Sequence, residues 1–185
     1  KTSYACALLA LFGPEFANEE PTEKWGSTWR KIEVLGHQAK DVLFLVDDYK
    51  PRIVRSADIT NIIQNYSESR GRGRLNRDAT IQATKWIRGA LLTTGEDIPE
   101  NEASVISRML ILRLTRPAGT NEALALAQAS SRHLSAVMYA YTTWLAETMP
   151  GSEGTIEAWL TAERDRLIAL CPTGCTNPGR LASNV

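Results

Sequence analysis

The feature that most constrains the fold of this chain is an apolar run that ends in two acidic residues. Residues 41–46 read Asp-Val-Leu-Phe-Leu-Val, and Asp47 and Asp48 follow directly. A continuous apolar run of this length, with no polar alternation, predicts a strand buried on both faces of a parallel sheet. Parallel strands need crossover connections, which are usually helices, so the run predicts an α/β fold.

Other segments predict the elements around this strand. Two further apolar segments, 90–93 and 109–114, predict additional strands of a mainly parallel sheet. Helical periodicity predicts flanking helices at 4–12, 27–40 and 57–67, with a polar loop at 14–26 and helices at 121–148 and 155–170. We therefore expect an α/β core over residues 1–118, a helical region over 119–171 and a flexible tail over 172–185.

Composition narrows the class of protein. A chain of 185 residues that is 43% hydrophobic can bury a substantial core. Lys and Arg number 21 and Asp and Glu also 21, so any nucleic-acid binding must rely on a local basic patch. No apolar run is long enough for a membrane span, and three cysteines do not form a disulfide framework. We expect a cytoplasmic protein without a membrane segment.

The acidic pair predicts a metal site. Open α/β sheets bind ligands at the carboxyl ends of their strands, where Asp47 and Asp48 lie. Two acids at such a strand end form a Walker B arrangement, in which one carboxylate holds Mg²⁺ and the next polarises the attacking water. The alternative is that the pair merely ends a strand before Lys50-Pro51.

The first two residues fit the end of a phosphate-binding motif. Lys1-Thr2 precedes a helix rich in small residues, as the last two residues of G-x-x-x-x-G-K-[ST] do. There the lysine reaches the β- and γ-phosphates of ATP and the hydroxyl binds Mg²⁺. A Lys-Thr dipeptide does not identify this motif by itself. It becomes informative because the acidic strand end and the hydroxyl strand end follow it in the expected order. We expect a P-loop NTPase core that is incomplete at its N-terminus, and no ATPase activity from this fragment alone.

Two later segments carry further candidates. The strand within 89–97 ends in hydroxyl residues, and Thr93 or Thr94 fits a sensor beside the γ-phosphate, unless the segment is only a Thr-Gly turn. Arg108 precedes the predicted strand at 109–114 and fits an arginine finger that reaches a neighbouring subunit's nucleotide. The alternative for Arg108 is a surface arginine that ends a helix.

A basic loop follows the third predicted helix. Arginine forks match phosphate geometry, and glycines let the backbone approach a phosphate chain. One interpretation is that the loop contacts DNA. A second is that Arg72 or Arg74, in place of Arg108, is the arginine finger that reaches a neighbouring subunit. The third is that the loop is solvated and has no binding role. Stacking aromatics are absent from it. Its arginines are Arg70, Arg72, Arg74 and Arg77.

Other residue patterns predict no chemistry. Cys171 and Cys175 have no nearby Cys or His partners, because the only histidines are His37 and His133, so a zinc site is not expected. Cys6 is expected to be a small buried residue. The remaining aromatic residues occupy apolar positions expected in the core, namely Trp29, Trp86, Tyr141, Trp144 and Trp159.

Four segments in order, 37–49, 70–77, 92–99 and 104–108, resemble a group of bacterial P-loop ATPases. These are the family called domain of unknown function 927 and its actinobacterial relatives, encoded beside primase-like domains on phages and integrated elements. The resemblance covers residues 1 to about 145. The layout is similar to that of superfamily 3 helicases, although Asp48 stands where many relatives have Glu and Thr94 where that superfamily usually has Asn.

The resemblance implies a function and a set of site residues. It implies an ATP- and Mg²⁺-dependent motor of a helicase- or primase-associated protein that acts on single-stranded or forked DNA in mobile-element replication. It also implies a homo-oligomer such as a hexameric ring. The non-catalytic alternative is a P-loop-derived module for assembly or DNA tethering. The implied site residues are Lys1 and Thr2 from Walker A, Asp47 and Asp48 from Walker B, the sensor Thr94 and the finger Arg108, with Mg²⁺ at Thr2 and Asp47.

Overall fold

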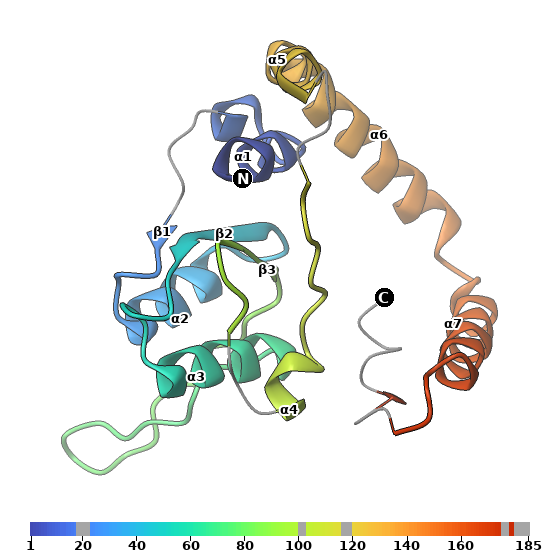
Figure 1. The fold of residues 1–185 in the computed structure, drawn as a ribbon. Coiled ribbons are helices and arrows are strands. Elements are labelled where there is room, and N and C mark those ends of the chain that lie inside the picture. The colour runs from blue at the N-terminus through green and yellow to red at the C-terminus, as the bar shows by residue number, and fades with distance from the viewer. Residues whose placement is uncertain (18–22, 100–102, 116–119, 175–177, 180–185) are drawn as a thin grey trace.

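A three-stranded parallel sheet with the order β1-β2-β3 forms the centre of the structure (Figure 1). The computed structural model describes residues 1–17, 23–99, 103–115, 120–174 and 178–179. β2 (Leu43–Tyr49) lies in the middle, between β1 (Glu23–Lys24) and β3 (Ala90–Gly95). The predicted strands at 41–46 and 90–93 are confirmed as adjacent parallel strands of an α/β fold.

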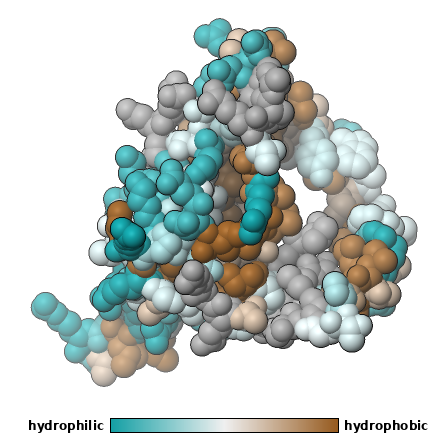
Figure 2. Space-filling model, viewed as in Figure 1, coloured by the Kyte–Doolittle hydropathy of each residue, from teal (hydrophilic) through white to brown (hydrophobic). Residues whose placement is uncertain are grey.

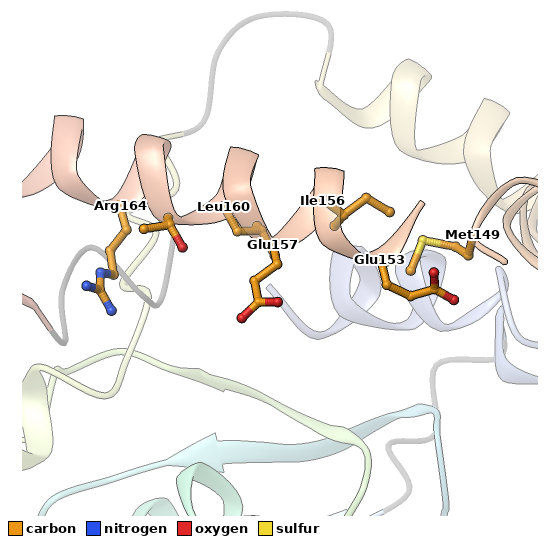
Figure 3. Close-up of a pocket in the computed structure, with 7 residues that line it drawn as sticks. Met149, Glu153, Ile156, Glu157, Leu160 and Arg164 are labelled. Atoms are coloured by element: carbon orange, nitrogen blue, oxygen red, sulfur yellow. The ribbon is translucent and has the colours of Figure 1, made fainter. Parts of the chain in front are cut away.

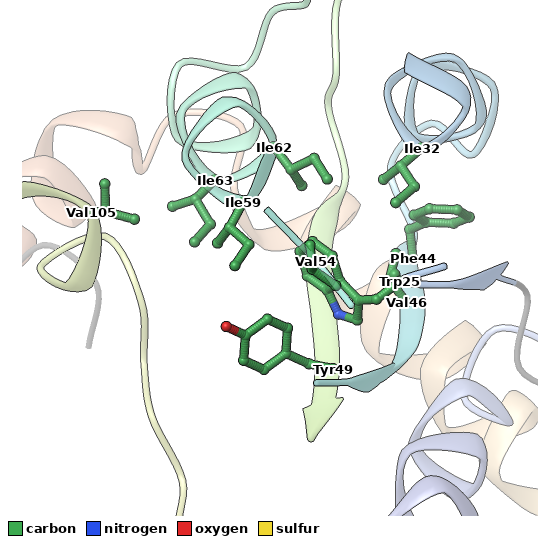
Figure 4. Close-up of a cluster of buried hydrophobic side chains, with 10 residues drawn as sticks. All are labelled: Trp25, Ile32, Phe44, Val46, Tyr49, Val54, Ile59, Ile62, Ile63 and Val105. Atoms are coloured by element: carbon green, nitrogen blue, oxygen red, sulfur yellow. The ribbon is translucent and has the colours of Figure 1, made fainter. Parts of the chain in front are cut away.

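Helices cover both faces of this sheet. Phe44 and Val46 pack with α2 (Trp29–Gln38) and α3 (Ser56–Ser67) on one face, in the cluster that Figure 4 shows. Leu45 packs against α1 (Thr2–Leu9) on the other face, where Cys6 is fully buried as expected. Because successive side chains of a strand point to opposite faces, two layers of helix explain why the run in β2 is apolar throughout.

The helices over the larger cluster have the predicted apolar faces. Ile32 of α2 is fully buried, and the half-buried Trp29 packs against the same cluster. In α3 the buried residues are Ile59, Ile62 and Ile63, which follow helical spacing. The N-cap of α2 is Thr28, whose hydroxyl accepts a hydrogen bond from the backbone N–H of Lys31 at 3.4 Å.

The prediction of a strand at 109–114 is wrong. This segment forms no strand and pairs with none of the strands that the structure describes, and Leu110, Leu112 and Leu114 are exposed. The third strand is instead β1, within the segment expected to be a polar loop. Its two residues pair with Val46 and Asp47, and the next N–H, of Trp25, donates to the Asp47 carbonyl oxygen. Backbone pairing with β2, not side-chain pattern, decides which segment is a strand.

The C-terminal region is helical, as expected. It contains α5 (Thr120–Ala129), α6 (Ser131–Thr148) and α7 (Glu153–Ala169), after the short α4 (Ala103–Ile106). α5 contacts α1, and α6 contacts the 3-10 turn η1 (Pro14–Ala17). Figure 1 shows α6 and α7 extending away from the sheet, and neither helix has a fully buried residue among those described.

Four aromatic residues expected in the core are exposed. Trp86, Tyr141, Trp144 and Trp159 each have more than half of their surface accessible, with Trp159 at 63%. Tyr141, Trp144 and Trp159 lie on α6 and α7. Because these helices stand away from the sheet, the three side chains do not pack into the core around it. The buried aromatic residues among those described are Trp25, Phe44 and Tyr49, and the rings of Trp25 and Tyr49 pack edge to face at 5.6 Å.

Candidate functional site

Asp47 is the centre of a polar cluster at the end of the sheet. Its side chain is nearly buried, with the residue 6% exposed. The Thr2 hydroxyl donates to the two carboxylate oxygens of Asp47 at 3.0 and 3.1 Å, and the Thr94 hydroxyl donates to Oδ1. Three elements far apart in sequence, the start of α1 and the ends of β2 and β3, therefore converge on one carboxylate.

Strand register explains why Thr94 rather than Thr93 meets Asp47. Val46 pairs with Thr93, so Asp47 and Thr94 are the next residues along two neighbouring parallel strands. Their side chains point to the same face of the sheet. The Thr93 hydroxyl points to the other face and accepts a hydrogen bond from Trp25 Nε1 at 2.6 Å. Asp47 and Thr94 therefore lie at the same edge of the sheet, as expected for residues at the carboxyl ends of two adjacent parallel strands.

Asp48 turns away from this cluster. Its backbone has φ +62°, a left-handed conformation that is uncommon outside glycine, and the β2–β3 pairing is irregular between Val46 and Tyr49. The half-exposed Asp48 carboxylate instead accepts a hydrogen bond from Lys50 Nζ at 2.9 Å. That hydrogen bond raises the pKa of the Lys50 ammonium. The two acids thus have different surroundings, one buried among hydroxyls and one facing solvent.

Lys1 lies near the same strand ends. Its Nζ is 3.9 Å from the carboxylate of Glu96, which follows β3 by one residue. Its carbonyl oxygen accepts the first backbone hydrogen bonds of α1, from Tyr4 and Ala5. The N-terminal end of α1, where unpaired N–H groups favour anions, therefore lies beside the Asp47 cluster. Glu96 was not a sequence candidate, although its place after Thr94-Gly95 puts it at the same edge.

The donor set of this cluster suits a small hard cation. Mg²⁺ is held by one or two carboxylates together with water and substrate phosphates, and it rarely uses an all-protein cage. The Asp47 carboxylate and the Thr2 hydroxyl are oxygen ligands of that kind. No group of three or more His, Cys, Asp or Glu that could hold a metal is present in the part of the chain that the structure describes. A cation at Asp47 would therefore need oxygen atoms from a bound ligand.

Arg108 is not brought to this cluster within the chain. It follows α4, and its guanidinium donates to the carbonyl oxygen of Ser104 in that helix. It does not precede a strand of the described structure, because residues 109–114 pair with none of β1, β2 and β3. Any contact of Arg108 with a nucleotide would therefore be with the site of a neighbouring subunit.

The arginine loop, residues 70–86, is a hairpin-like excursion between α3 and β3. Two antiparallel bridges, Arg70 with Trp86 and Leu75 with Ile81, join its two sides. Figure 1 shows it projecting from the body at the lower left, and Figure 2 shows hydrophilic and hydrophobic side chains together there. Arg74 is not available as a finger in this arrangement, because its guanidinium pairs with the buried Glu33 at 2.7 Å.

Two cavities lie away from Asp47. A shallow groove of about 300 Å³ is lined only by residues 149–164 of the helical region, including Met149, Ile156 and Leu160 (Figure 3). A second hollow of about 280 Å³ lies at the amino ends of β2 and β3, lined by Phe12, Asp41 and Arg88 among others. Neither contains a predicted site residue.

These features define an α/β protein with a small parallel sheet between helices and a hydroxyl–carboxylate cluster at its strand ends. Searches with protein-family models, curated proteins and solved structures return no match to the chain. Among the helices that the structure describes, none has both the length and the apolar character needed to cross a membrane.

Proposed function

We propose that this chain is the portion of a P-loop NTPase core that follows the glycine-rich loop, and that the full-length protein binds and hydrolyses ATP with Mg²⁺ to drive a motor acting on DNA. The observation that carries the proposal is the convergence of Thr2 and Thr94 on Asp47. In this proposal Thr2 acts as the Walker A hydroxyl, Thr94 as the sensor and Asp47 as the Walker B carboxylate.

Each residue has a defined role in this proposal. Mg²⁺, when bound, would neutralise the charge that develops on the β- and γ-phosphates. Thr2 and Asp47 would hold it, with Thr94 fixing the orientation of the Asp47 carboxylate. Lys1, at the N-terminal end of α1, would contact the phosphates. Asp48 is the proposed base that orients the attacking water. Its half-exposed carboxylate is paired with Lys50, so this role requires the side chain to leave Lys50 and turn toward the site.

The open edge of β3 supports a larger sheet in the full-length protein. β3 pairs with β2 on one side, and no described strand pairs with its other side. An edge strand with unpaired backbone groups is able to accept a further strand. We propose that a strand leading into the glycine-rich loop pairs there. Leu110, Leu112 and Leu114, exposed at alternate positions of the segment 109–114, would gain apolar cover in the completed core.

The test uses the full-length protein with its glycine-rich loop. We expect DNA-stimulated ATP hydrolysis that is lost in Asp47→Asn and in Asp48→Asn. Asp165→Asn, an exposed change on α7, is the matched control and should retain full activity. An intact glycine loop with Mg²⁺ and DNA but no hydrolysis would contradict the motor and favour the alternative.

That alternative is a P-loop-derived module that assembles or tethers DNA without turnover. The observation that favours it is the exposed apolar surface of α6 and α7, which suits an assembly contact. It predicts intact oligomerisation or DNA binding in the Asp47→Asn protein, with no nucleotide hydrolysis in any variant.

A further inference from the structure

Glu33 of α2 is a buried carboxylate that holds the arginine loop in place. It is 2% exposed and accepts three hydrogen bonds. Asn65 Nδ2 of α3 donates at 3.0 Å, the backbone N–H of Arg72 at 3.2 Å and Arg74 Nη2 at 2.7 Å. A carboxylate buried this deeply persists only when donors surround it, and here two of the three come from the loop.

The backbone of the loop is shaped to reach Glu33. A Cβ at Gly71 would lie 3.0 Å from Glu33 Cδ, so a side chain at that position would require Glu33 to shift by a few tenths of an ångström. The N–H of Gly71 also donates to the Lys85 carbonyl oxygen at 2.6 Å, which closes the base of the loop. The Arg74 guanidinium lies 5.7 Å from the centre of the Trp29 ring. The base of the loop is therefore fixed against α2 and α3.

This anchor divides the arginines into two groups. Arg74 is paired with Glu33, whereas Arg70, Arg72 and Arg77 are exposed and no described carboxylate pairs with them. Arg30 of α2 is also exposed and lies over the same Trp29 ring at 5.6 Å. The exposed arginines therefore belong to two elements, the loop and α2, which are joined through Glu33 and Trp29.

An exposed aromatic side chain accompanies these arginines. Trp86 is 55% exposed and pairs with Arg70 across the base of the loop. Its carbonyl oxygen is 2.7 Å from His37 Nδ1, which ties that side of the loop to α2. An exposed indole next to arginine is the combination that binds single-stranded nucleic acid, because the ring stacks on a base while arginines contact phosphates. An acidic peptide has no bases to stack.

We propose that the arginine loop and Arg30 form a binding surface for single-stranded nucleic acid, in which Arg30, Arg72 and Arg77 contact phosphates, Trp86 stacks on a base, and Glu33 with Arg74 only positions the loop. The choice of nucleic acid agrees with the proposed function and rests partly on it. The distinction between Arg74, which positions the loop, and the arginines that contact phosphates is based only on the contacts of Glu33.

Binding is measured on the 185-residue chain without nucleotide, by fluorescence anisotropy of a labelled single-stranded oligothymidylate over a range of salt concentrations. Arg72→Ala and Arg77→Ala should each weaken binding and reduce the salt slope by about one unit. Trp86→Ala should weaken it by about 5- to 150-fold, the range expected for loss of one stacked base. Arg132→Ala, an exposed arginine on α6, is the matched control and should change nothing.

The positioning role has its own readout. Glu33→Gln should weaken binding at temperatures where circular dichroism shows a fully folded chain, with faster amide exchange across residues 71–75. Gly71→Ala should do the same without changing any charge, which covers the case in which Glu33→Gln fails to fold. Arg74→Ala should leave the salt slope at its original value.

Three results would overturn the proposal. One is a salt slope reduced as much by Arg74→Ala as by Arg72→Ala. Another is displacement of the oligonucleotide by polyglutamate as readily as by unlabelled oligonucleotide, since that partner would be an acidic protein. The third is binding no stronger than that of a chain in which Arg30, Arg72 and Arg77 are all alanine. ATPase assays on the full-length protein test the motor separately, so either proposal can fail while the other stands.

Discussion

The hydroxyl of Thr94 donates a hydrogen bond to the carboxylate of Asp47 across the β2–β3 pair. Because Asp47 is nearly buried, it depends on Thr94 and Thr2 for the donors that water would otherwise supply. The same carboxylate is the proposed Mg²⁺ ligand, so these contacts link the stability of the fold to the site.

Replacing Thr94 by valine should destabilise the chain and impair the site. A hydrogen bond to a charged group contributes about 1.5–3 kcal/mol, so the free energy of unfolding should fall by that amount in urea titrations. Thr143→Val, an exposed threonine on α6, should change stability by less than about 0.5 kcal/mol. Equal stability of the two variants would show that Asp47 does not depend on Thr94.

Substitutions at Asp48 should distinguish the backbone strain at this residue from the role of its carboxylate in ATP hydrolysis. The left-handed backbone at φ +62° favours glycine, so Asp48→Gly should keep or raise the free energy of unfolding. Asp48→Ala should lower it by about 1 kcal/mol, because alanine has neither glycine's freedom nor a side chain that supports this conformation. Both variants should lose ATPase activity in the full-length protein. A lower stability for the glycine variant than for the alanine variant would contradict strain at this position.

The buried hydroxyl of Tyr66 has no hydrogen-bond partner among the described residues. Tyr66→Phe should therefore be neutral or stabilising, by up to about 1–3 kcal/mol, because it removes an unpaired buried polar group. Gly36→Ala should be strongly destabilising, since its Cβ would collide with that hydroxyl. The double variant should recover part of the loss, and additive effects in urea unfolding would show that the two residues are not in contact.

Tyr66 also predicts a pH dependence. Burial raises the pKa of its phenol above the ordinary value. In the unfolded chain the Tyr66 phenol ionises near pH 10, whereas in the folded chain it stays protonated to higher pH. The contribution of Tyr66 to the free energy of unfolding is therefore complete below about pH 10 and is lost as the pH rises above it. The loss should approach 1.4 kcal/mol per pH unit. The Tyr66→Phe protein should show a smaller decline between pH 10 and 12, measured by denaturant unfolding.

Arg74 and Arg72 should differ sharply in their effects on stability. Arg74→Ala leaves the buried Glu33 without its cationic partner, and removing one member of a buried pair lowers stability by about 3–5 kcal/mol. Arg74 is itself partly exposed, which places the expected loss at the lower end of that range. Arg72→Ala keeps the backbone donor to Glu33 and should cost less than about 0.5 kcal/mol. Similar melting temperatures for the two variants would contradict the anchoring of the loop by Glu33.

If the full-length protein forms the proposed oligomer, Arg108 should act on a neighbouring subunit. In its own chain it is bound to Ser104 and does not contact the Asp47 cluster in the described structure. A true finger changes turnover by on the order of 10³-fold or more while leaving nucleotide affinity nearly intact. Mixing Arg108→Ala subunits with Asp48→Asn subunits should restore part of the ATPase activity. Mixed oligomers that form but remain inactive would rule out the action in trans.

Local sequence patterns correctly predicted the elements that have strong apolar periodicity. The continuous run that became β2, the helical spacing of Ile59, Ile62 and Ile63, and the meeting of Asp47 with Thr94 at one sheet edge all follow from strand and helix geometry. Residues at the ends of adjacent parallel strands must lie together, so part of the candidate site could be located without coordinates.

Tertiary structure decided what periodicity could not. Residues 109–114 have a strand pattern but no partner, whereas Glu23–Lys24 have no pattern and pair with β2. Burial of Glu33 and exposure of Trp86 likewise depend on what packs beside them. The type of a residue indicates only its local secondary-structure preference. The hydrogen-bond partners of a residue and the side chains that bury it come from segments distant in sequence. The sequence alone therefore determined the central strands and their acidic ends, and only the packed chain decided which segment pairs with β2 at its other edge and which arginine is held by Glu33.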